Sequence, residues 1–168
     1  GCVHLGIANM HKVGAIGLPG FDWEVKICND QLVPVPRGEA GELLARGPGV
    51  MKCYYGDQAD SEKVLVDGWL LTGDIARQDE DGYIWLVDRK KDVIITGGEN
   101  IYPVEIEDFL QTHPGIQDAA VIGLPSLRLG EIAAAIIKAK PGQDLTQDDI
   151  ADFCQELPRY KRPRRFIF

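Results

Sequence analysis

The sequence predicts an α+β fold in two parts: a β-barrel-like subdomain, then a small α+β domain joined to it by a hinge segment. Short apolar stretches between glycines and prolines fill the first half, which favours a small barrel or a distorted sheet. Apolar stripes at helical spacing with clear start and stop signals lie in the second half. Where the two patterns meet, four consecutive charged residues, 88–91, indicate a linker.

The first part, residues 1–87, is expected to consist mainly of strands. An alternating stretch at 23–27 runs into the turn residues Asn29 and Asp30, and the acidic run before Gly82 predicts another tight turn. Residues 61–66 suit either a short helix or a loop. The expected strands are 23–27, 41–46, 67–72 and 83–87.

The second part, residues 88–168, combines strands with two helices. Pro103 stands where a helix begins, with glutamates in its first turns, and His113-Pro114 ends it. A last helix opens at Leu145-Thr146 and stops before Pro158. The expected strands are 92–96, 116–124 and 131–138.

Composition excludes several classes of protein. The chain has 18 Lys and Arg against 26 Asp and Glu, a net charge of −8, which argues against non-specific nucleic-acid binding. No apolar run is long enough to span a membrane. The four cysteines lack metal-ligand spacing, so we expect no metal site and reduced thiols in the cytoplasm. They are Cys2, Cys28, Cys53 and Cys154.

One carboxylate and one arginine are candidates for nucleotide recognition. Asp74 closes the segment 72–74 after an expected strand, and a carboxylate can accept two hydrogen bonds from a vicinal diol such as ribose. Arg89 follows the next expected strand, so a β-hairpin would bring both to one edge. Together they suit a nucleotide, whose diol would bind the carboxylate and whose phosphate or ribose oxygen would bind the guanidinium. The alternatives are an ordinary turn residue and a structural salt bridge.

Two further patterns allow a functional and a structural interpretation. Gly97 and Gly98 lie between an expected strand and a helix, where glycine permits close approach of a ligand or simply a tight strand-to-helix turn. The run 159–165 carries five cations in seven residues, which suits a local anion site or a solvated chain end. The sequence contains no standard phosphate loop and no persuasive catalytic triad.

Long motifs in a fixed order resemble the adenylate-forming superfamily of acyl-CoA synthetases, peptide-synthetase adenylation domains and luciferases. They are GELLARGPGVMKCYYG at 41–56, DGWLLTGD at 67–74, DEDGYIWLVDRKKDVIITGGENIYPVEIE at 79–107, and LPRYKRP at 157–163. Order and spacing match over essentially the whole chain, and the segment 88–103 is most similar to acyl- or aryl-CoA synthetases.

The resemblance implies a role for several residues. Asp74 matches the aspartate that holds the ribose hydroxyls of ATP, and Arg89 matches an arginine that also contacts the ribose. Lys91 matches the hinge about which the small domain rotates. Asn100 stands where some relatives have an arginine that contacts a phosphate, and departs from that pattern. The remaining matches are Gly97, Gly98 and Glu99 for the pantetheine channel, with Lys161, Arg162, Arg164 and Arg165 as candidates for the CoA phosphates.

The resemblance also implies an activity. The expected parent protein is an ATP-dependent acyl- or aryl-CoA synthetase of fatty-acid or aromatic-acid metabolism, which makes an acyl-adenylate from a small carboxylic acid and then a thioester with CoA. Its requirements are ATP, CoA and Mg²⁺, the last bound outside this chain. Residues 1–87 then form the end of the large adenylation domain and 88–168 most of the small C-terminal domain.

The chain lacks counterparts of the family's phosphate loop and catalytic lysine. We therefore expect no catalytic residue in it and no synthetase activity from it alone. Its start without Met and its strand-like end at 166–168 suggest a piece of a longer protein. Two alternatives stay open: an adenylation enzyme that loads a carrier-protein thiol, and a stand-alone, non-catalytic binding module.

Overall fold

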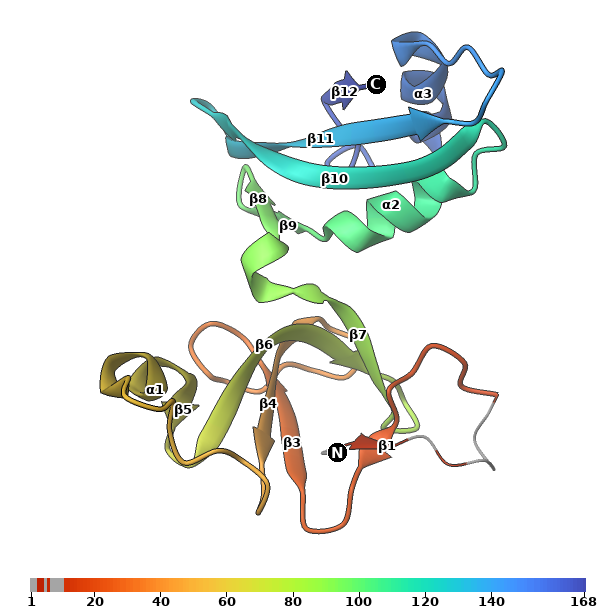
Figure 1. Cartoon of the computed structure of the whole chain (residues 1–168). Coiled ribbons are helices and arrows are strands. Elements are labelled where there is room, and N and C mark those ends of the chain that lie inside the picture. Colours follow the sequence, from red (N-terminus) through yellow and green to blue (C-terminus); the bar gives the residue numbers. More distant parts are fainter. Residues whose placement is uncertain (1–2, 5, 7–10) are drawn as a thin grey trace. The chain divides into compact units, whose positions relative to one another are not determined.

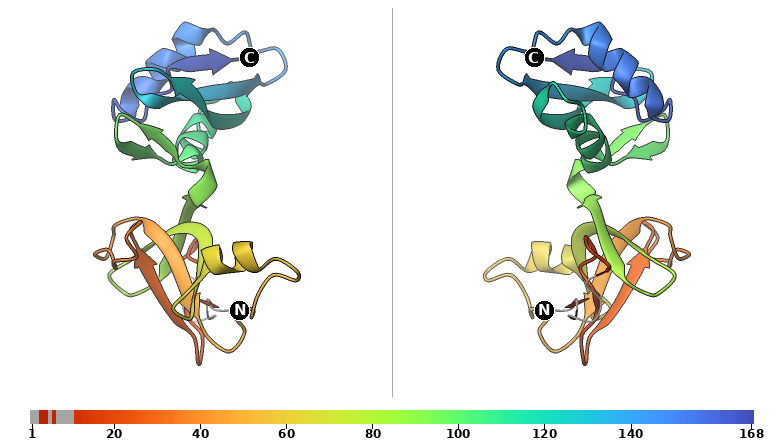
Figure 2. Two further views of the ribbon diagram at one scale, coloured as in Figure 1. Left: turned by 90° about the vertical axis from the view of Figure 1, so that its left-hand side faces the viewer. Right: turned by 90° about the vertical axis from the view of Figure 1, so that its right-hand side faces the viewer.

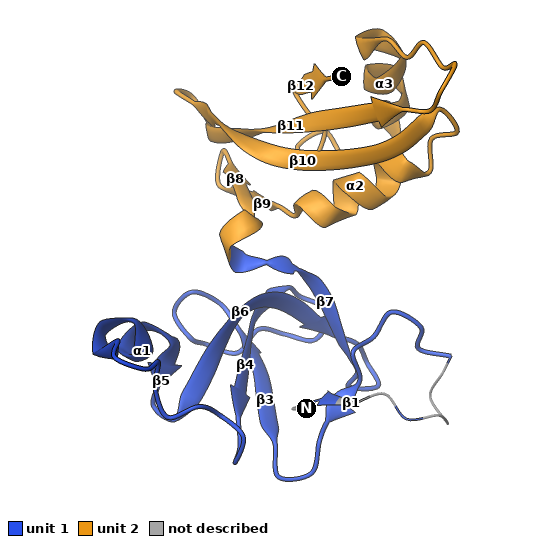
Figure 3. Cartoon of the chain, in the orientation of Figure 1, with its two compact units in different colours: residues 1–90 blue, residues 91–168 orange. Residues whose placement is uncertain are grey.

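The computed structural model describes residues 3–4, 6 and 11–168, and the chain divides into two compact units, residues 1–90 and 91–168 (Figure 1, Figure 3). The predicted mixed fold class is confirmed, because strands dominate both units and a few short helices accompany them. No helix in the described part of the chain combines the length and the apolar character that a membrane crossing needs.

Unit 1 is built on an antiparallel sheet with the strand order β3-β4-β6-β5, and β7 pairs with the later part of β6, on the same side as β5 (Figure 1). The sheet curls into a half barrel (Figure 2). A separate two-stranded ladder joins β1 to β2. The elements are β1 (Val3–His4), β2 (Leu18–Pro19), β3 (Glu24–Cys28), β4 (Gly41–Arg46), α1 (Gln58–Val64), β5 (Leu65–Val66), β6 (Trp69–Gln78) and β7 (Ile84–Arg89).

The sequence of β4 explains why this strand lies at the centre of unit 1. Five of its six residues are buried, so both of its faces are covered and its apolar residues run consecutively rather than alternating. Leu43 joins Ile27, Ala76 and Ile84 in the core cluster. Of the two expectations for 61–66, the helix is correct for 61–64, whereas 65–66 form β5; α1 begins earlier, after Asp57, whose side chain accepts the Asp60 N–H.

Unit 2 has a five-stranded sheet with the order β10-β11-β8-β9, and β12 runs parallel to β11 (Figure 1). Two helices and a short 3₁₀ turn accompany it, and the 3₁₀ helix η2 crosses the boundary between the units. The elements are η2 (Lys90–Asp92), β8 (Ile94–Thr96), β9 (Glu99–Ile101), α2 (Pro103–Gln111), β10 (Ile116–Ser126), β11 (Gly130–Ala139), α3 (Gln147–Phe153), η3 (Cys154–Glu156) and β12 (Arg165–Ile167).

Both helices of unit 2 contribute to one core. Ile106 and Leu110 of α2 and Ile150 of α3 are fully buried in the same cluster. Phe109 and Phe153 stack on each other with ring centroids 4.7 Å apart, which joins α2 to α3 directly.

The local signals that predicted these two helices act as expected. Pro103 occupies the first turn of α2, where its missing N–H costs no hydrogen bond. Thr146 and Asp149 form a reciprocal capping box at the start of α3, so two backbone N–H groups at that end are satisfied by side chains.

Several expected element boundaries are wrong. β6 does not end before Asp74 but continues to Gln78, because it keeps pairing with β4 and β7. Gly97 and Gly98 connect β8 to β9, so they form a strand-to-strand turn, not a strand-to-helix turn. β7 extends to Arg89, so part of the charged run expected as a linker belongs to the sheet.

Candidate functional site

A bulge in β6 contains the predicted diol-binding aspartate. Glu42 and Leu44 of β4 keep their partners in β6, but the whole segment Thr72–Asp74 lies opposite Leu43 alone. Gly73 in this segment has φ +73°, in the left-handed region that favours glycine. Bulges redirect side chains out of the regular ladder, and here the side chain redirected is that of Asp74.

Side-chain oxygens hold the bulge in place of ladder hydrogen bonds. The Thr72 hydroxyl donates to the Leu43 carbonyl at 2.7 Å and accepts the Asp74 N–H at 3.1 Å. The Gly73 N–H donates to Oε1 of Glu42, also at 3.1 Å. The backbone N–H groups of Gly73 and Asp74 are thereby satisfied by side chains.

Asp74 and Arg89 meet across β6 and β7. They are direct partners in the antiparallel register, and Arg89 Nε lies 2.9 Å from Asp74 Oδ1. The Asp74 side chain is 26% exposed and that of Arg89 is 63% exposed, so the pair is open to solvent. A carboxylate has about four acceptor positions, so an ion pair through one oxygen leaves capacity for further donors.

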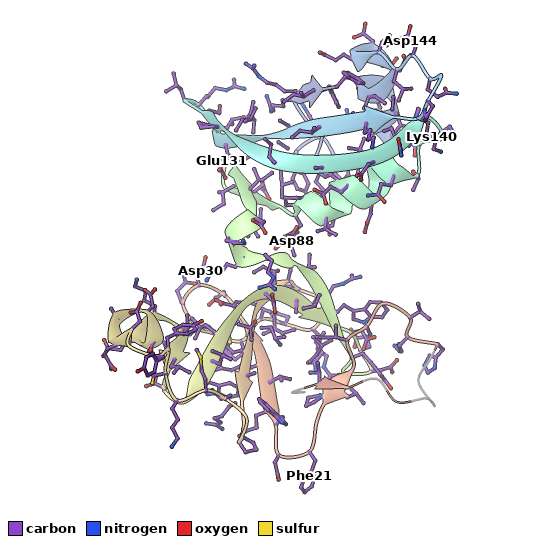
Figure 4. All side chains as sticks on the ribbon, in the orientation of Figure 1. Phe21, Asp30, Asp88, Glu131, Lys140 and Asp144 are labelled. Carbon is purple, nitrogen blue, oxygen red and sulfur yellow. The ribbon has the colours of Figure 1, made fainter. Side chains whose placement is uncertain are left out.

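A buried carboxylate lies beneath this pair and was missed by sequence reasoning. Glu42 is 5% exposed; its Oε2 receives Lys90 Nζ at 2.9 Å, and Asp30 Oδ1 lies 3.0 Å from the same ammonium (Asp30 is labelled in Figure 4). The hydrogen bond with Glu42 is the main cause that raises the pKa of Lys90 above its usual value. The sequence signal that could have indicated a buried carboxylate is Glu42 itself, the one acid in the otherwise apolar first part of β4.

The paired glycines form the tip of a hairpin in unit 2. Gly97 and Gly98 have φ +59° and +89°, as in a two-residue turn in which both central residues are left-handed. The Gly97 N–H donates to the Leu129 carbonyl at 2.8 Å. A Cβ at Gly98 would meet no atom within 4 Å, so the surface at this tip is open.

The next two residues of β9, Glu99 and Asn100, are exposed. The Asn100 side chain hydrogen-bonds that of Tyr102, while burial raises the pKa of the tyrosine phenol.

The structure divides the five cations of the basic run 159–165 into two groups. Lys161 forms an ion pair with Glu105 on α2, and the guanidinium of Arg162 donates to the carbonyl oxygens of Leu157 and Gln155 and to the Gln155 side chain. These cations therefore hold parts of unit 2 together. Arg159, Arg164 and Arg165 are exposed, and their side chains take part in no ion pair among the described residues.

The predicted hinge residue, Lys91, is the first residue of unit 2 and lies within η2, where its side chain is exposed. The described residues contain no group of three or more His, Cys, Asp or Glu that could hold a metal ion. Cys28, Cys53 and Cys154 are free thiols, and Cys2 lies outside the described residues.

Family models match both ends of the chain. The model described as "AMP-binding enzyme" matches residues 1–55, and the one described as "AMP-binding enzyme C-terminal domain" matches residues 105–168.

Curated relatives align with nearly the whole chain. A feruloyl-CoA synthase of Amycolatopsis sp. is 42% identical over 94% of this chain and 32% of its own length. A long-chain-fatty-acid–CoA ligase of Salmonella typhimurium is 42% identical over 99% of the chain and 30% of its own length. The chain thus spans about a third of the length of these relatives.

A solved structure of a CoA synthetase is similar to almost the whole chain. The o-succinylbenzoate CoA synthetase of Bacillus subtilis, in complex with its acyl-adenylate intermediate, superposes with a TM-score of 0.87 and 36% identity. The match covers 99% of this chain and 34% of that one. The mixed fold, the order of the motifs and these matches lead to one conclusion: the chain belongs to the adenylate-forming, AMP-binding superfamily of enzymes.

Proposed function

We propose that this chain supplies the ribose-binding residues and most of the small domain of an ATP-dependent acyl- or aryl-CoA synthetase. In the first half-reaction, a carboxylate oxygen of the acid bonds to the α-phosphorus of ATP and pyrophosphate leaves. In the second, the thiol of CoA attacks the acyl carbon, loses its proton, and AMP leaves. The curated relatives named above are CoA synthases and ligases, which supports this reaction class.

The observation that carries the proposal is the Asp74–Arg89 pair. Its two members come from adjacent strands, and the bulge of β6 turns the carboxylate toward solvent beside a guanidinium that is mostly exposed. A carboxylate can accept both hydroxyls of a ribose diol while the guanidinium donates to a ribose oxygen. Their contribution is to bind and orient the nucleotide, since positioning supplies much of the gain in phosphoryl-group chemistry.

Residues of unit 2 fit the thioester-forming step. The tip formed by Gly97 and Gly98 carries no side chain, which suits the passage of a slim pantetheine arm, with Glu99 and Asn100 next to it. Among the basic residues, Arg164 and Arg165 are the better candidates for the CoA phosphates. Lys161 and Arg162 already have partners inside unit 2.

The domain assignment is part of the same proposal. Residues 1–87 correspond to the β-rich end of the large domain and 88–168 to most of the small domain, with Lys91 as the hinge; the division of the compact units between Lys90 and Lys91 supports this position. The expected ligands of the enzyme are ATP, CoA, a small carboxylic acid and Mg²⁺. The Mg²⁺ ion is bound by parts of the enzyme outside this chain. The free thiols of the described cysteines support a cytoplasmic location.

The test is an exchange of labelled pyrophosphate into ATP by the enzyme that carries this chain, with a panel of fatty and aromatic acids. Asp74→Asn should reduce exchange strongly, because an amide cannot accept two hydroxyls as a carboxylate does. Asp67→Asn is the matched control: Asp67 is exposed in the turn between β5 and β6 at φ +49°, which asparagine tolerates. Equal loss in both variants would contradict the assignment.

Two arms of the same assay address the alternatives. Offering free CoA and a carrier protein bearing phosphopantetheine distinguishes a CoA synthetase from an enzyme that loads a carrier thiol. The isolated 168-residue chain should show no turnover. Pyrophosphate exchange by the isolated chain that depends on an added carboxylic acid would contradict that expectation. No exchange by the natural protein that carries this chain would favour a binding module.

A further inference from the structure

A single buried carboxylate joins the two segments that carry the Asp74–Arg89 pair. Glu42 Oε1 accepts the N–H of Gly73, and Glu42 Oε2 accepts Lys90 Nζ. Gly73 immediately precedes Asp74, and Lys90 immediately follows Arg89. We propose that Glu42 is a positioning residue, which ties the bulge of β6 to the end of β7 and thereby sets the geometry of the Asp74–Arg89 pair.

The bulge needs such a tether because its own strand does not hold it. The segment Thr72–Asp74 lies opposite one residue of β4, so the ladder cannot fix all three backbone positions. Gly73 is also the residue with the greatest backbone freedom. The hydrogen bond from its N–H to Glu42 therefore acts together with the Thr72 hydroxyl to select one conformation for the peptide next to Asp74.

The other oxygen of Glu42 acts on the arginine side. Arg89 is the last residue of β7, and beyond it the chain leaves the sheet in η2. The Lys90 ammonium, held by Glu42 and Asp30, anchors this exit. Without the anchor, the last register position of β7 would rest on the end of the β6–β7 ladder and on the exposed ion pair, and exposed ion pairs contribute little by themselves.

The chemistry of the residue explains why a glutamate is required at this place. A buried carboxylate offers acceptors on both oxygens and needs a cation nearby, and Glu42 has both a backbone donor and an ammonium. Glutamine keeps only one acceptor oxygen, and its amide nitrogen is a donor that cannot accept from Lys90. The variant Glu42→Gln can therefore satisfy one of the two partners but not both.

The test uses solution NMR on the 168-residue chain, with two readouts. Solvent exchange of the Gly73 N–H reports the bulge, and exchange of the Arg89 Nε–H reports the ion pair with Asp74. Glu42→Ala should accelerate both by about tenfold or more, since a charge-assisted hydrogen bond is worth roughly one tenfold step or two. Lys90→Met should accelerate the arginine signal by about threefold or more and the Gly73 signal less than Glu42→Ala does, because the Gly73 N–H keeps its acceptor.

The remaining variants make the series decisive. Glu42→Gln should resemble Lys90→Met, because its one oxygen still accepts the Gly73 N–H. Glu39→Gln, which removes an exposed carboxylate three positions away, is the matched control and should change neither signal. Wild-type exchange rates in Glu42→Ala, or equal effects in the control, would overturn the proposal. If Glu42→Ala does not fold, an unchanged Arg89 signal in both Glu42→Gln and Lys90→Met would overturn it.

A functional arm rests on the proposed function. In the enzyme that carries this chain, Lys90→Met and Glu42→Gln should raise KM for ATP about tenfold and leave kcat within about threefold, because the loss concerns binding of the nucleotide. A wild-type enzyme without ATP-dependent activity would refute the proposed function, and the NMR series would still decide the role of Glu42. An active enzyme whose KM is unchanged in both variants would refute the positioning role alone.

Discussion

Replacing Thr72 with valine should loosen the bulge of β6 without changing the size of the side chain. The hydroxyl makes two hydrogen bonds, as a donor to the Leu43 carbonyl at 2.7 Å and as an acceptor from the Asp74 N–H at 3.1 Å. At about 1 kcal/mol for each, Thr72→Val should lower the free energy of unfolding of unit 1 by about 2 kcal/mol. Thr72→Ser keeps both hydrogen bonds and loses one half-buried methyl group, at a cost of less than ~0.8 kcal/mol.

Tryptophan fluorescence isolates the relevant unit in this measurement. Trp23, Trp69 and Trp85 are the only tryptophans of the sequence, and all three belong to unit 1. At a urea dependence of roughly 1–3 kcal/mol per molar, the valine variant should shift the midpoint down by about 1 M. Equal urea midpoints for Thr72→Val and Thr72→Ser would refute the reasoning, because the hydroxyl would then contribute nothing measurable to the stability of unit 1.

Three further outcomes are expected. Lys12 holds the pKa of Asp79 well below its usual range, so unit 1 gains stability above about pH 4 that is lost as the pH falls toward that lowered value, and Lys12→Met should reduce this acid dependence in fluorescence-monitored titrations. The pKa of Lys12 is itself raised to about 12, mainly by its hydrogen bond to Asp79. The stability that this ion pair contributes should therefore be lost at alkaline pH only as the pH approaches about 12. Leu110→Ala, at a fully buried position, should destabilise unit 2 by about 2–5 kcal/mol by circular dichroism, whereas exposed Leu127→Ala should change little. Gly98→Ala should cost about 1 kcal/mol through its φ of +89° alone, since its Cβ meets no neighbour; a larger loss would indicate an unrecognised contact.

The sequence predicted those elements whose signals are local. Pro103 marks the start of α2, and Thr146 with Asp149 marks the start of α3, because a helix end is decided by residues within one turn of it. The pairing of Asp74 with Arg89 was also predictable, since a hairpin brings nearby strands together. The roles of these residues in binding a nucleotide stay predictions.

The features that sequence reasoning missed depend on distant partners. Whether β6 ends at Thr72 or continues through a bulge is decided by the pairing of β4, about thirty residues earlier in the chain. Glu42 carries no motif of its own, and its importance follows only from burial and from the two donors that converge on it. The turn at Gly97 was assigned to the wrong kind of connection because the short strand β9 has only three residues.

The different exposure of the two ion pairs around the bulge gives them different responses to ionic strength. Arg89 is 63% exposed, and at about 1 M salt a screening length near 3 Å weakens its attraction to Asp74. Glu42 is 5% exposed, so mobile ions cannot come between it and Lys90 to the same degree. The protein thus combines an ion pair at Glu42 that salt weakens little with an exposed Asp74–Arg89 pair that salt weakens more, so high salt should loosen the pair without releasing the strands that carry it.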